Sequence, residues 1–342
     1  MNDQIKVKID VLLHFLRKNK DHLVIDADTH VTELNTLSGA ISKLYQTTPN
    51  YFHGRPISAE DLLKEMNLAG VDMSLIWQNP STLEYYQEDL DGNYEKLLKA
   101  NRNILNAFLQ HPTRFIPAGW TDPKALGVHN ALKLIEVLIQ EFGFFIVKMN
   151  PAQNAYPLFS DGVVKCVERI VALGGVPAFH FGADTIYTPP EDLEKIAELH
   201  LETPILAVHM GGGGASYLEA EETYLKTREL GLRMPNIKFI LSAKRDTHIE
   251  SDLITYQLAG APFKHNIFCA SDAPYGRQSW NFGGYDSMFK SLMNGKLHTD
   301  QRLQENHDAF SQEDVNNYLG GNFARFIIEW YEKFLIKQMV SS

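Results

Sequence analysis

The chain has 342 residues, of which 44% are hydrophobic and 22% are charged, so it can bury a large globular core. Its formal net charge of −10 disfavours nucleic acid as a partner, because an acidic surface repels phosphate groups. No stretch reaches the roughly 20 apolar residues of a membrane span, and no small-residue cleavage site follows the apolar N-terminal segment. We therefore expect a cytoplasmic protein without membrane association. Its two cysteines are too few for a disulfide scaffold, and Cys269 lies in an apolar run that predicts burial.

Eight short runs rich in Ile, Val and Phe alternate with helical stretches. Runs of this kind are typical of strands buried on both faces of a parallel sheet. They cover residues 23–28, 71–77, 115–120, 144–149, 176–181, 205–209, 237–242 and 267–270. Eight repeats of strand and helix predict one closed (β/α)₈ TIM barrel with an outer ring of helices. An open doubly wound sheet is the alternative, but it usually carries a glycine-rich turn after its first strand, where this chain has Asp28-Thr29-His30.

The helical stretches carry apolar residues at helical spacing and have recognisable ends. They cover residues 59–69, 93–109, 125–141, 191–200 and 219–230. Gly70 is expected to end the first of them and Gly231 the last, whereas Pro190 suits a helix start. We predict an N-terminal helical extension over residues 1–21 and a barrel domain over 22–342, with insertions after the first and second strands.

Polar side chains follow the first predicted strand. Asp26, Asp28 and His30 alternate along the chain, so a regular strand would place all three on one face. In barrel enzymes the active site forms at the carboxyl ends of the strands. We therefore expect Asp28 and His30 to reach the barrel mouth.

Three further polar residues end other strands at the same rim. His180 ends the fifth strand, His209 ends the sixth, and Asp272 follows the eighth. Imidazoles and carboxylates together form the ligand set of zinc and related divalent ions. Each residue alone has a structural alternative, such as a hydrogen-bonded core histidine, a helix cap or a turn. Together they predict one metal ion, with Asp272 also placed to act as a general base.

Six motifs in chain order resemble the amidohydrolase-related family, in the branch that includes aminocarboxymuconate semialdehyde decarboxylase. They lie at residues 24–31, 111–115, 146–151, 208–212, 270–274 and 319–325. The resemblance implies a mononuclear metal site with His30, His180, His209 and Asp272 as ligands. Asp28 departs from the family, because many members have histidine there and some decarboxylases of aromatic acids have glutamate. We expect zinc as the metal ion, and the extra oxygen ligand of Asp28 makes manganese the next candidate.

Residues around the mouth are candidates for binding a small, carboxylated substrate. Cationic and aromatic side chains suit a carboxylate-bearing molecule, although solvated loop charges and loop packing explain them as well. The candidates are His53, Trp77, Lys148, Lys244, Arg245, His248 and Arg277. Lys148 lies where related binuclear enzymes have a carbamylated lysine, and a structural ion pair is its alternative.

The predicted function is hydrolysis of a small carboxylated amide or lactone by metal-activated water, with Asp272 and His209 as catalytic residues. The first alternative is a metal-dependent non-oxidative decarboxylase that uses the same residues. The carboxylate of Asp28 favours this alternative. A metal-free lactonase and a non-catalytic binding barrel are the others. Because outer helices of barrels often pair, we also consider a homodimer.

Overall fold

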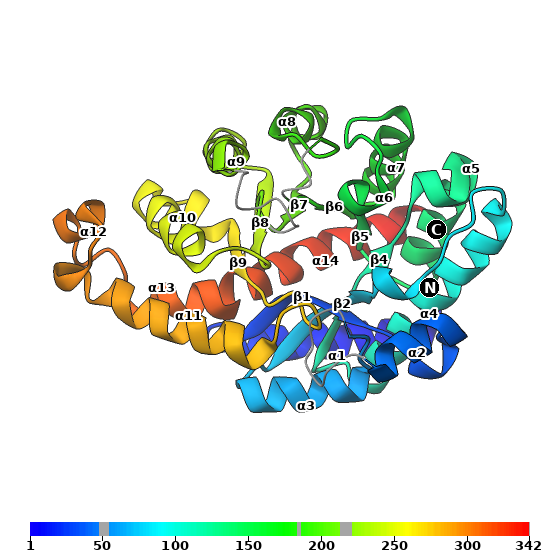
Figure 1. The fold of residues 1–342 in the computed structure, drawn as a ribbon, viewed down its shortest axis with the longest axis horizontal. Helices are drawn as coiled ribbons and strands as arrows, with labels where there is room; N and C mark the ends of the chain where they lie inside the picture. The colour runs from blue at the N-terminus through cyan, green and yellow to red at the C-terminus, as the bar shows by residue number, and fades with distance from the viewer. Residues whose placement is uncertain (48–54, 183–185, 213–220, 342) are drawn as a thin grey trace.

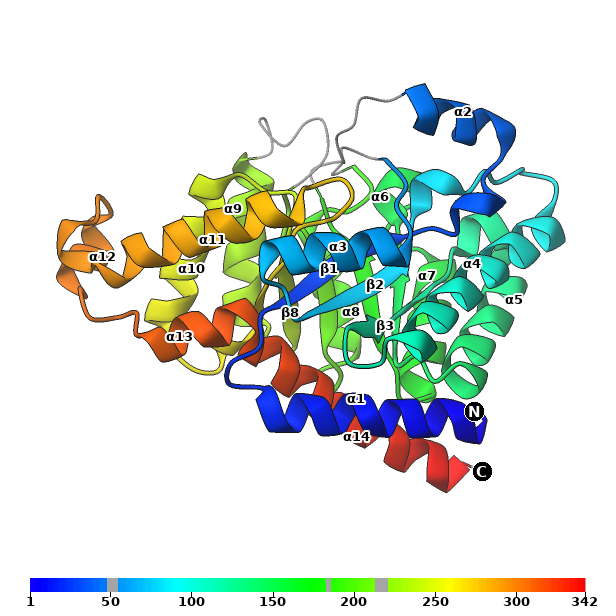
Figure 2. The same cartoon turned by 90° about the horizontal axis from the view of Figure 1, so that it is seen from below.

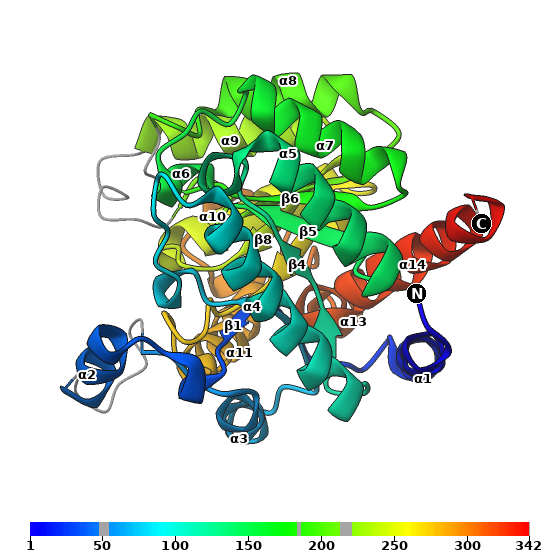
Figure 3. The ribbon, with the colours of Figure 1, turned by 90° about the vertical axis from the view of Figure 1, so that its right-hand side faces the viewer.

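The computed structural model describes residues 1–47, 55–182, 186–212 and 221–341. Its strands form a parallel barrel with helices on the outside, as Figures 1 and 3 show. The strands are β1 (Ile25–Val31), β2 (Met73–Gln78), β3 (Phe115–Pro117), β4 (Gly119–Trp120), β5 (Ile146–Met149), β6 (Val176–His180), β7 (Ile205–Val208), β8 (Ile237–Leu241) and β9 (Ile267–Cys269). All eight predicted runs contain a strand, and the third run is divided into β3 and β4 at Ala118.

Hydrogen bonds between neighbouring strands close the barrel. The strands pair in parallel in the orders β1-β2-β3 and β4 to β9. The amide of Ala118 donates to the Ile76 carbonyl and so joins the two sheets at 3.1 Å. A parallel bridge between Thr29 and Ala273 joins the first strand to the segment after the last one. The predicted TIM barrel is therefore confirmed.

The helices lie along the outside of the barrel wall and across one of its ends (Figures 1 and 2). They are α1 (Asp3–Asn19), α2 (Gly39–Thr47), α3 (Ala59–Ala69), α4 (Leu90–Gln110), α5 (Pro123–Glu136), α6 (Pro151–Asn154), α7 (Asp161–Ala172), α8 (Pro190–Leu199), α9 (Glu221–Arg233), α10 (Asp246–Ala259), α11 (Gln278–Met293), α12 (Gln301–Glu305), α13 (Gln312–Asn316) and α14 (Asn322–Ser341). None of the helices within the described residues is long and apolar enough to span a lipid bilayer.

The structure confirms the predicted helix end at Gly70 and contradicts the one at Gly231. Gly70 caps α3 in the left-handed region at φ 69°, as expected. The expected end at Gly231 is wrong, because α9 continues to Arg233. A Cβ atom at Gly231 would lie 2.1 Å from the Tyr256 hydroxyl and 2.2 Å from the Phe239 ring. This glycine therefore allows α9 to pack closely against β8 and α10, rather than ending the helix.

Helix α1 lies beside α14 across the end of the barrel opposite α2 (Figure 2). Its buried face carries Ile5, Ile9, Leu12 and Leu16 at helical spacing, each no more than 3% exposed. The extension expected over residues 1–21 thus contains a helix, and the division into an extension and a barrel domain stays a prediction. Because α1 covers the end away from the carboxyl ends of the strands, it leaves the predicted site open to the other side.

Candidate metal centre

Asp28 is the most enclosed group of the site. Its side chain is fully buried, and its two oxygens have different partners. Oδ1 accepts a hydrogen bond from Trp77 Nε1 at 2.8 Å and lies 3.4 Å from Lys148 Nζ. Oδ2 accepts a hydrogen bond from the Ser242 hydroxyl at 2.7 Å. Side chains from β2, β5 and the end of β8 therefore fix this one carboxylate of β1 in place.

The charge of Asp28 is stabilised by cationic and polar neighbours. Burial raises the pKa of Asp28, but the positive charge of Lys148, together with the hydrogen bond from Ser242, holds this pKa well below its usual range. Lys148 is itself 1% exposed and lies 4.5 Å from the ring centroid of Trp77 and 5.1 Å from that of Trp120. Asp28 is therefore an ionised carboxylate, the form that binds a metal ion.

His30 presents one ring nitrogen to the two carboxylates. Its Nδ1 lies 2.9 Å from the Gln78 carbonyl oxygen, which can only accept, so Nδ1 carries the proton. The remaining nitrogen, Nε2, lies 3.4 Å from Asp272 Oδ1 and 3.6 Å from Asp28 Oδ1. A backbone carbonyl that orients a histidine in this way is typical of metal-ligating histidines.

His180 and His209 point their rings at one another. Nδ1 of His180 lies 3.2 Å from Nε2 of His209. Burial lowers the pKa of both rings, and for His180 the neighbouring His209 lowers it further. Both are therefore neutral imidazoles near pH 7, with a lone pair available for a cation.

Ser242 sets the orientation of His209. Its hydroxyl proton is donated to Asp28, so the same oxygen accepts from Nδ1 of His209 at 2.8 Å. The lone pair of His209 is then on Nε2, which faces His180. The sequence did not single out Ser242, although it ends a predicted strand just as His180 and His209 do. That position at the carboxyl end of a strand was the available signal.

The five predicted ligands form one cluster. Asp28, His209 and Asp272 each offer an atom within 4.8 Å of the other two. His30 joins this group through Asp28 and Asp272, and His180 joins it through His209. Two ligands of one divalent ion, with bonds of about 2.1 Å, lie roughly 3.0–3.4 Å apart. The two closest pairs, at 3.4 and 3.2 Å, match that spacing, so the residues present fit a single divalent ion.

Asp26 does not belong to this cluster, contrary to the expectation that it shares a face with Asp28 and His30. The pairing of β1 with β2 shifts register between Asp26 and Thr29, which breaks the regular alternation. The Asp26 carboxylate instead accepts hydrogen bonds from Ser271 and from Gln278 of the outer helix α11. Burial raises the pKa of Asp26 to about 7.

The predicted substrate residues lie in several different environments. His53 lies outside the described residues. Trp77 and Lys148 are buried and contact Asp28. The side chain of Lys244 is buried and its Nζ lies 2.5 Å from Asp252, while His248 stacks on Tyr224 at 4.0 Å between ring centroids.

The remaining two candidates lie at helix starts. Arg245 precedes the first turn of α10 and Arg277 precedes that of α11, where its guanidinium lies 3.8 Å from Glu65. Substrate binding by these residues and by those of the preceding paragraph stays a prediction.

Tyr275 closes the site on one side. Its ring meets that of His30 edge to face at 5.6 Å, and its hydroxyl donates to Asn79 Oδ1 at 2.7 Å. It also contacts the Ser81 hydroxyl. Tyr275 therefore links the segment after β9 to the segment after β2, directly beside a predicted metal ligand.

Glycines allow the backbone to approach His180. A Cβ atom at Gly182 would lie 2.8 Å from the Gly212 carbonyl oxygen and 3.0 Å from His180 Nε2. Gly211 adopts a positive φ of 75°, which favours glycine. The expectation that the glycines after His209 permit close approach is met at Gly211 and Gly212, whereas Gly213 and Gly214 lie outside the described residues.

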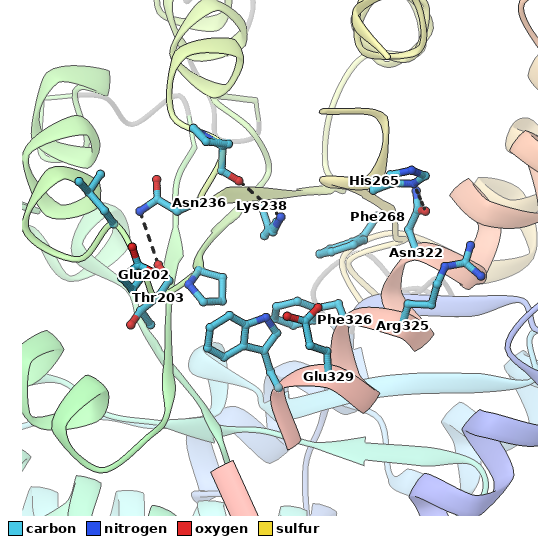
Figure 4. A pocket seen from close by; sticks show the side chains of 14 residues that line it. Glu202, Thr203, Asn236, Lys238, His265, Phe268, Asn322, Arg325, Phe326 and Glu329 are labelled. Atoms are coloured by element: carbon cyan, nitrogen blue, oxygen red, sulfur yellow. Dashed lines mark hydrogen bonds between the residues drawn. The ribbon is translucent and has the colours of Figure 1, made fainter. Parts of the chain in front are cut away.

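A cavity of about 490 Å³ lies at the opposite end of the barrel (Figure 4). It is bounded by residues near the starts of β7, β8 and β9 and by α14, with Lys238 facing Phe326 and Glu329 of that helix. This face of a TIM barrel contributes to stability rather than to catalysis. The cavity is therefore separate from the cluster around Asp28.

The chain belongs to the amidohydrolase family, because the model of this family matches residues 25–326, most of its length. No curated protein sequence matches it significantly.

Solved structures of low sequence identity share the barrel. The 5-carboxyvanillate decarboxylase of Novosphingobium aromaticivorans, bound to manganese and a nitrobenzoic acid, is 15% identical with a TM-score of 0.62, and the match covers 92% of this chain and 97% of that one. A dihydroxybenzoic acid decarboxylase of Polaromonas, bound to manganese and 2-nitroresorcinol, is 13% identical with a TM-score of 0.61, covering 91% and 97%. A probable 2-pyrone-4,6-dicarboxylic acid hydrolase of Acinetobacter baumannii is 15% identical with a TM-score of 0.50, covering 86% and 98%.

Proposed function

We propose that this protein is a metal-dependent, non-oxidative decarboxylase of a small aromatic carboxylic acid. The observation that carries the proposal is the buried cluster of two carboxylates and three histidines at the carboxyl ends of the strands. This is the alternative that the sequence suggested beside hydrolysis. It is supported over hydrolysis by the likeness to two manganese-containing decarboxylases of aromatic acids and by the carboxylate at position 28.

One divalent ion would be held by Asp28, His30, His180, His209 and Asp272. When bound, it would supply positive charge that holds the carboxylate and a neighbouring oxygen of the substrate. Two carboxylates in the donor set add oxygen ligands, which favour manganese more than a histidine-rich set does. We therefore place manganese before zinc, in the reverse of the order expected from the sequence.

The chain's own residues would manage the proton. In the reaction the bond between the ring carbon and the carboxylate breaks, and its electron pair stays on the ring carbon. That carbon takes up a proton, and CO₂ leaves. Asp272 is the most exposed of the five predicted ligands, at 8%, and is therefore the group that a substrate at the mouth reaches first. We assign it the proton transfer, with His209 beside it as the second catalytic residue.

Hydrolysis of a lactone is the second candidate. It is favoured by the similarity to a probable lactone hydrolase and by the distance of 3.4 Å between Asp272 and His30, which suits a carboxylate acting as a general base beside a metal ligand. The same ligands would serve both reactions, so the loss of CO₂ and the fate of solvent atoms are what separate them.

Isotope labelling provides that separation. Manganese-loaded protein is incubated with a panel of hydroxylated benzoic acids and lactones in D₂O, and in parallel in water enriched in ¹⁸O. Decarboxylation predicts products that have lost CO₂ and gained one deuterium on carbon. Hydrolysis predicts products that have gained ¹⁸O, and this outcome would refute the main proposal.

A matched pair of variants locates the activity. Asp272→Asn should abolish turnover, whereas Asp286→Asn, on the exposed surface of α11, should leave it unchanged. Metal analysis should give about one equivalent per chain. Turnover that survives complete removal of the metal would instead support the metal-free lactonase.

A further inference from the structure

His209 lies in a strained stretch of backbone at the carboxyl end of β7. Its φ is 76° and that of Met210 is 46°, so two consecutive residues with a Cβ atom adopt the left-handed region. Such backbone costs free energy and persists where the surrounding structure holds it in place. Because His209 is a predicted metal ligand, the groups that hold this stretch also determine where its imidazole points.

Neighbouring strands hold the two amides on either side of Met210. The amide of His209 donates to the Ile240 carbonyl of β8 at 2.9 Å. The amide of Gly211 donates to the Phe181 carbonyl, also at 2.9 Å. Met210 is itself fully buried, and a buried backbone carbonyl requires a hydrogen-bond donor.

Lys244, which follows β8, supplies a donor to that carbonyl. Its Nζ lies 3.1 Å from the Met210 carbonyl oxygen, and its side chain is fully buried. Two residues earlier, the Ser242 hydroxyl contacts the imidazole of His209. The segment after β8 therefore contacts the segment after β7 at two points, one on the His209 ring and one on the backbone that carries it.

A buried carboxylate anchors the ammonium group of Lys244. Oδ2 of Asp252, on α10, lies 2.5 Å from Nζ, and the centroid of the Tyr224 ring lies 4.3 Å from it. Oδ1 of the same carboxylate accepts hydrogen bonds from Arg228 at 2.8 Å and from the Tyr224 hydroxyl at 3.0 Å. The two oxygens thus have separate roles, because Oδ2 holds the lysine that contacts Met210, whereas Oδ1 holds an arginine of α9.

We propose that Lys244 is a positioning residue for the metal centre: its ammonium group, anchored on Asp252, holds the backbone at Met210 and so orients the imidazole of His209. The inference rests on the proposed metal centre, but it is the same for decarboxylation and for hydrolysis. It differs from the substrate-binding role predicted from the sequence. The ammonium group already contacts a carboxylate, a carbonyl oxygen and a ring face of the protein.

The test compares Lys244→Met with Arg228→Met as a matched control. Both substitutions remove one cation from the Asp252 carboxylate and leave it the other, so both should lower the free energy of unfolding in urea. Only Lys244→Met also loses the hydrogen bond to the Met210 carbonyl. In titrations of the metal-free full chain with Mn²⁺, Lys244→Met should bind about tenfold or more weakly. Arg228→Met should bind as tightly as the wild type.

A spectroscopic signature separates this role from a general loss of stability. Protein labelled with ¹⁵N in its histidines is saturated with Mn²⁺, and electron–nuclear double resonance then detects the imidazoles bound to the ion. The ¹⁵N couplings of the wild type should be retained in Arg228→Met. In Lys244→Met part of them should shift, because the His209 ring has lost the support of its backbone.

The outcomes separate this inference from the proposal for the metal centre. Wild-type manganese affinity and ¹⁵N couplings in Lys244→Met would overturn the inference and leave the metal centre intact. An equal loss of affinity in both variants would also overturn it, because the buried ion pairs would then act through stability alone. A wild type that binds neither manganese nor zinc would refute the metal centre and the inference together. If Lys244→Met fails to fold, Lys244→Met combined with Asp252→Asn removes the anion with the cation and should show the same loss.

Discussion

Replacing Ser242 by alanine should weaken metal binding without touching any predicted ligand. The Ser242 hydroxyl is 2.7 Å from Asp28 Oδ2 and 2.8 Å from His209 Nδ1, and the residue is 1% exposed. His209 retains a weaker partner, the Ser242 carbonyl oxygen at 3.3 Å, so the main loss falls on Asp28. A hydrogen bond to a charged group contributes about 1.5–3 kcal/mol, which corresponds to roughly 10- to 100-fold in a dissociation constant. We therefore expect manganese to bind about 10- to 100-fold more weakly.

The dissociation constant can be measured from the electron paramagnetic resonance signal of free Mn²⁺. Ser74→Ala is the matched control, because Ser74 is a fully buried strand serine whose hydroxyl contacts Gln278 rather than Asp28. The control should lower stability while leaving manganese affinity unchanged. A Ser242→Ala protein that folds and binds manganese as tightly as the wild type would refute the argument that this hydroxyl orients the ligands.

Three further changes test other parts of the site. Trp77→Phe removes the indole donor 2.8 Å from Asp28 and should weaken manganese binding in the same titration, with the ring packing retained. Gly182→Ala places a Cβ atom 3.0 Å from His180 Nε2, so metal content per chain should fall in elemental analysis. Asp26→Asn tests the pH dependence of folding. The pKa of Asp26 is about 7 in the folded protein and about 4 in the unfolded chain, so the folded state binds the proton more tightly. The stabilisation that Asp26 gives to the folded protein is therefore complete below pH 4 and is lost as pH rises to 7. Urea titrations should show that the free energy of unfolding of the wild type falls relative to that of the variant as pH rises from 4 to 7; profiles that run parallel would contradict the argument.

A buried ion pair between Lys148 and Asp28 would constrain the metal centre. The two groups lie 3.4 Å apart with almost no solvent contact. A bound cation would share the Asp28 carboxylate with this ammonium group, and burial strengthens both interactions. This contact agrees with the ion-pair alternative for Lys148. The lysine faces Oδ1 of Asp28, whereas Oδ2 accepts the hydrogen bond from Ser242 and does not face the lysine.

The sequence by itself determined the strands and the residues that end them. Runs of apolar residues identify strands buried on both faces, and a barrel brings the carboxyl ends of all its strands to one rim. These two local rules were enough to place His180, His209 and Asp272 in one cluster with Asp28 and His30.

Only the tertiary structure decided which groups surround that cluster. Trp77, Lys148 and Ser242 reach Asp28 from three other strands, and a register shift in β1 turns Asp26 towards α11. Periodicity along a chain reports which face of an element is buried, but it carries no information on strand register or on which distant side chain fills the adjoining space. Those features depend on packing between segments as far apart as residues 28 and 242, and they exist only once the barrel has closed.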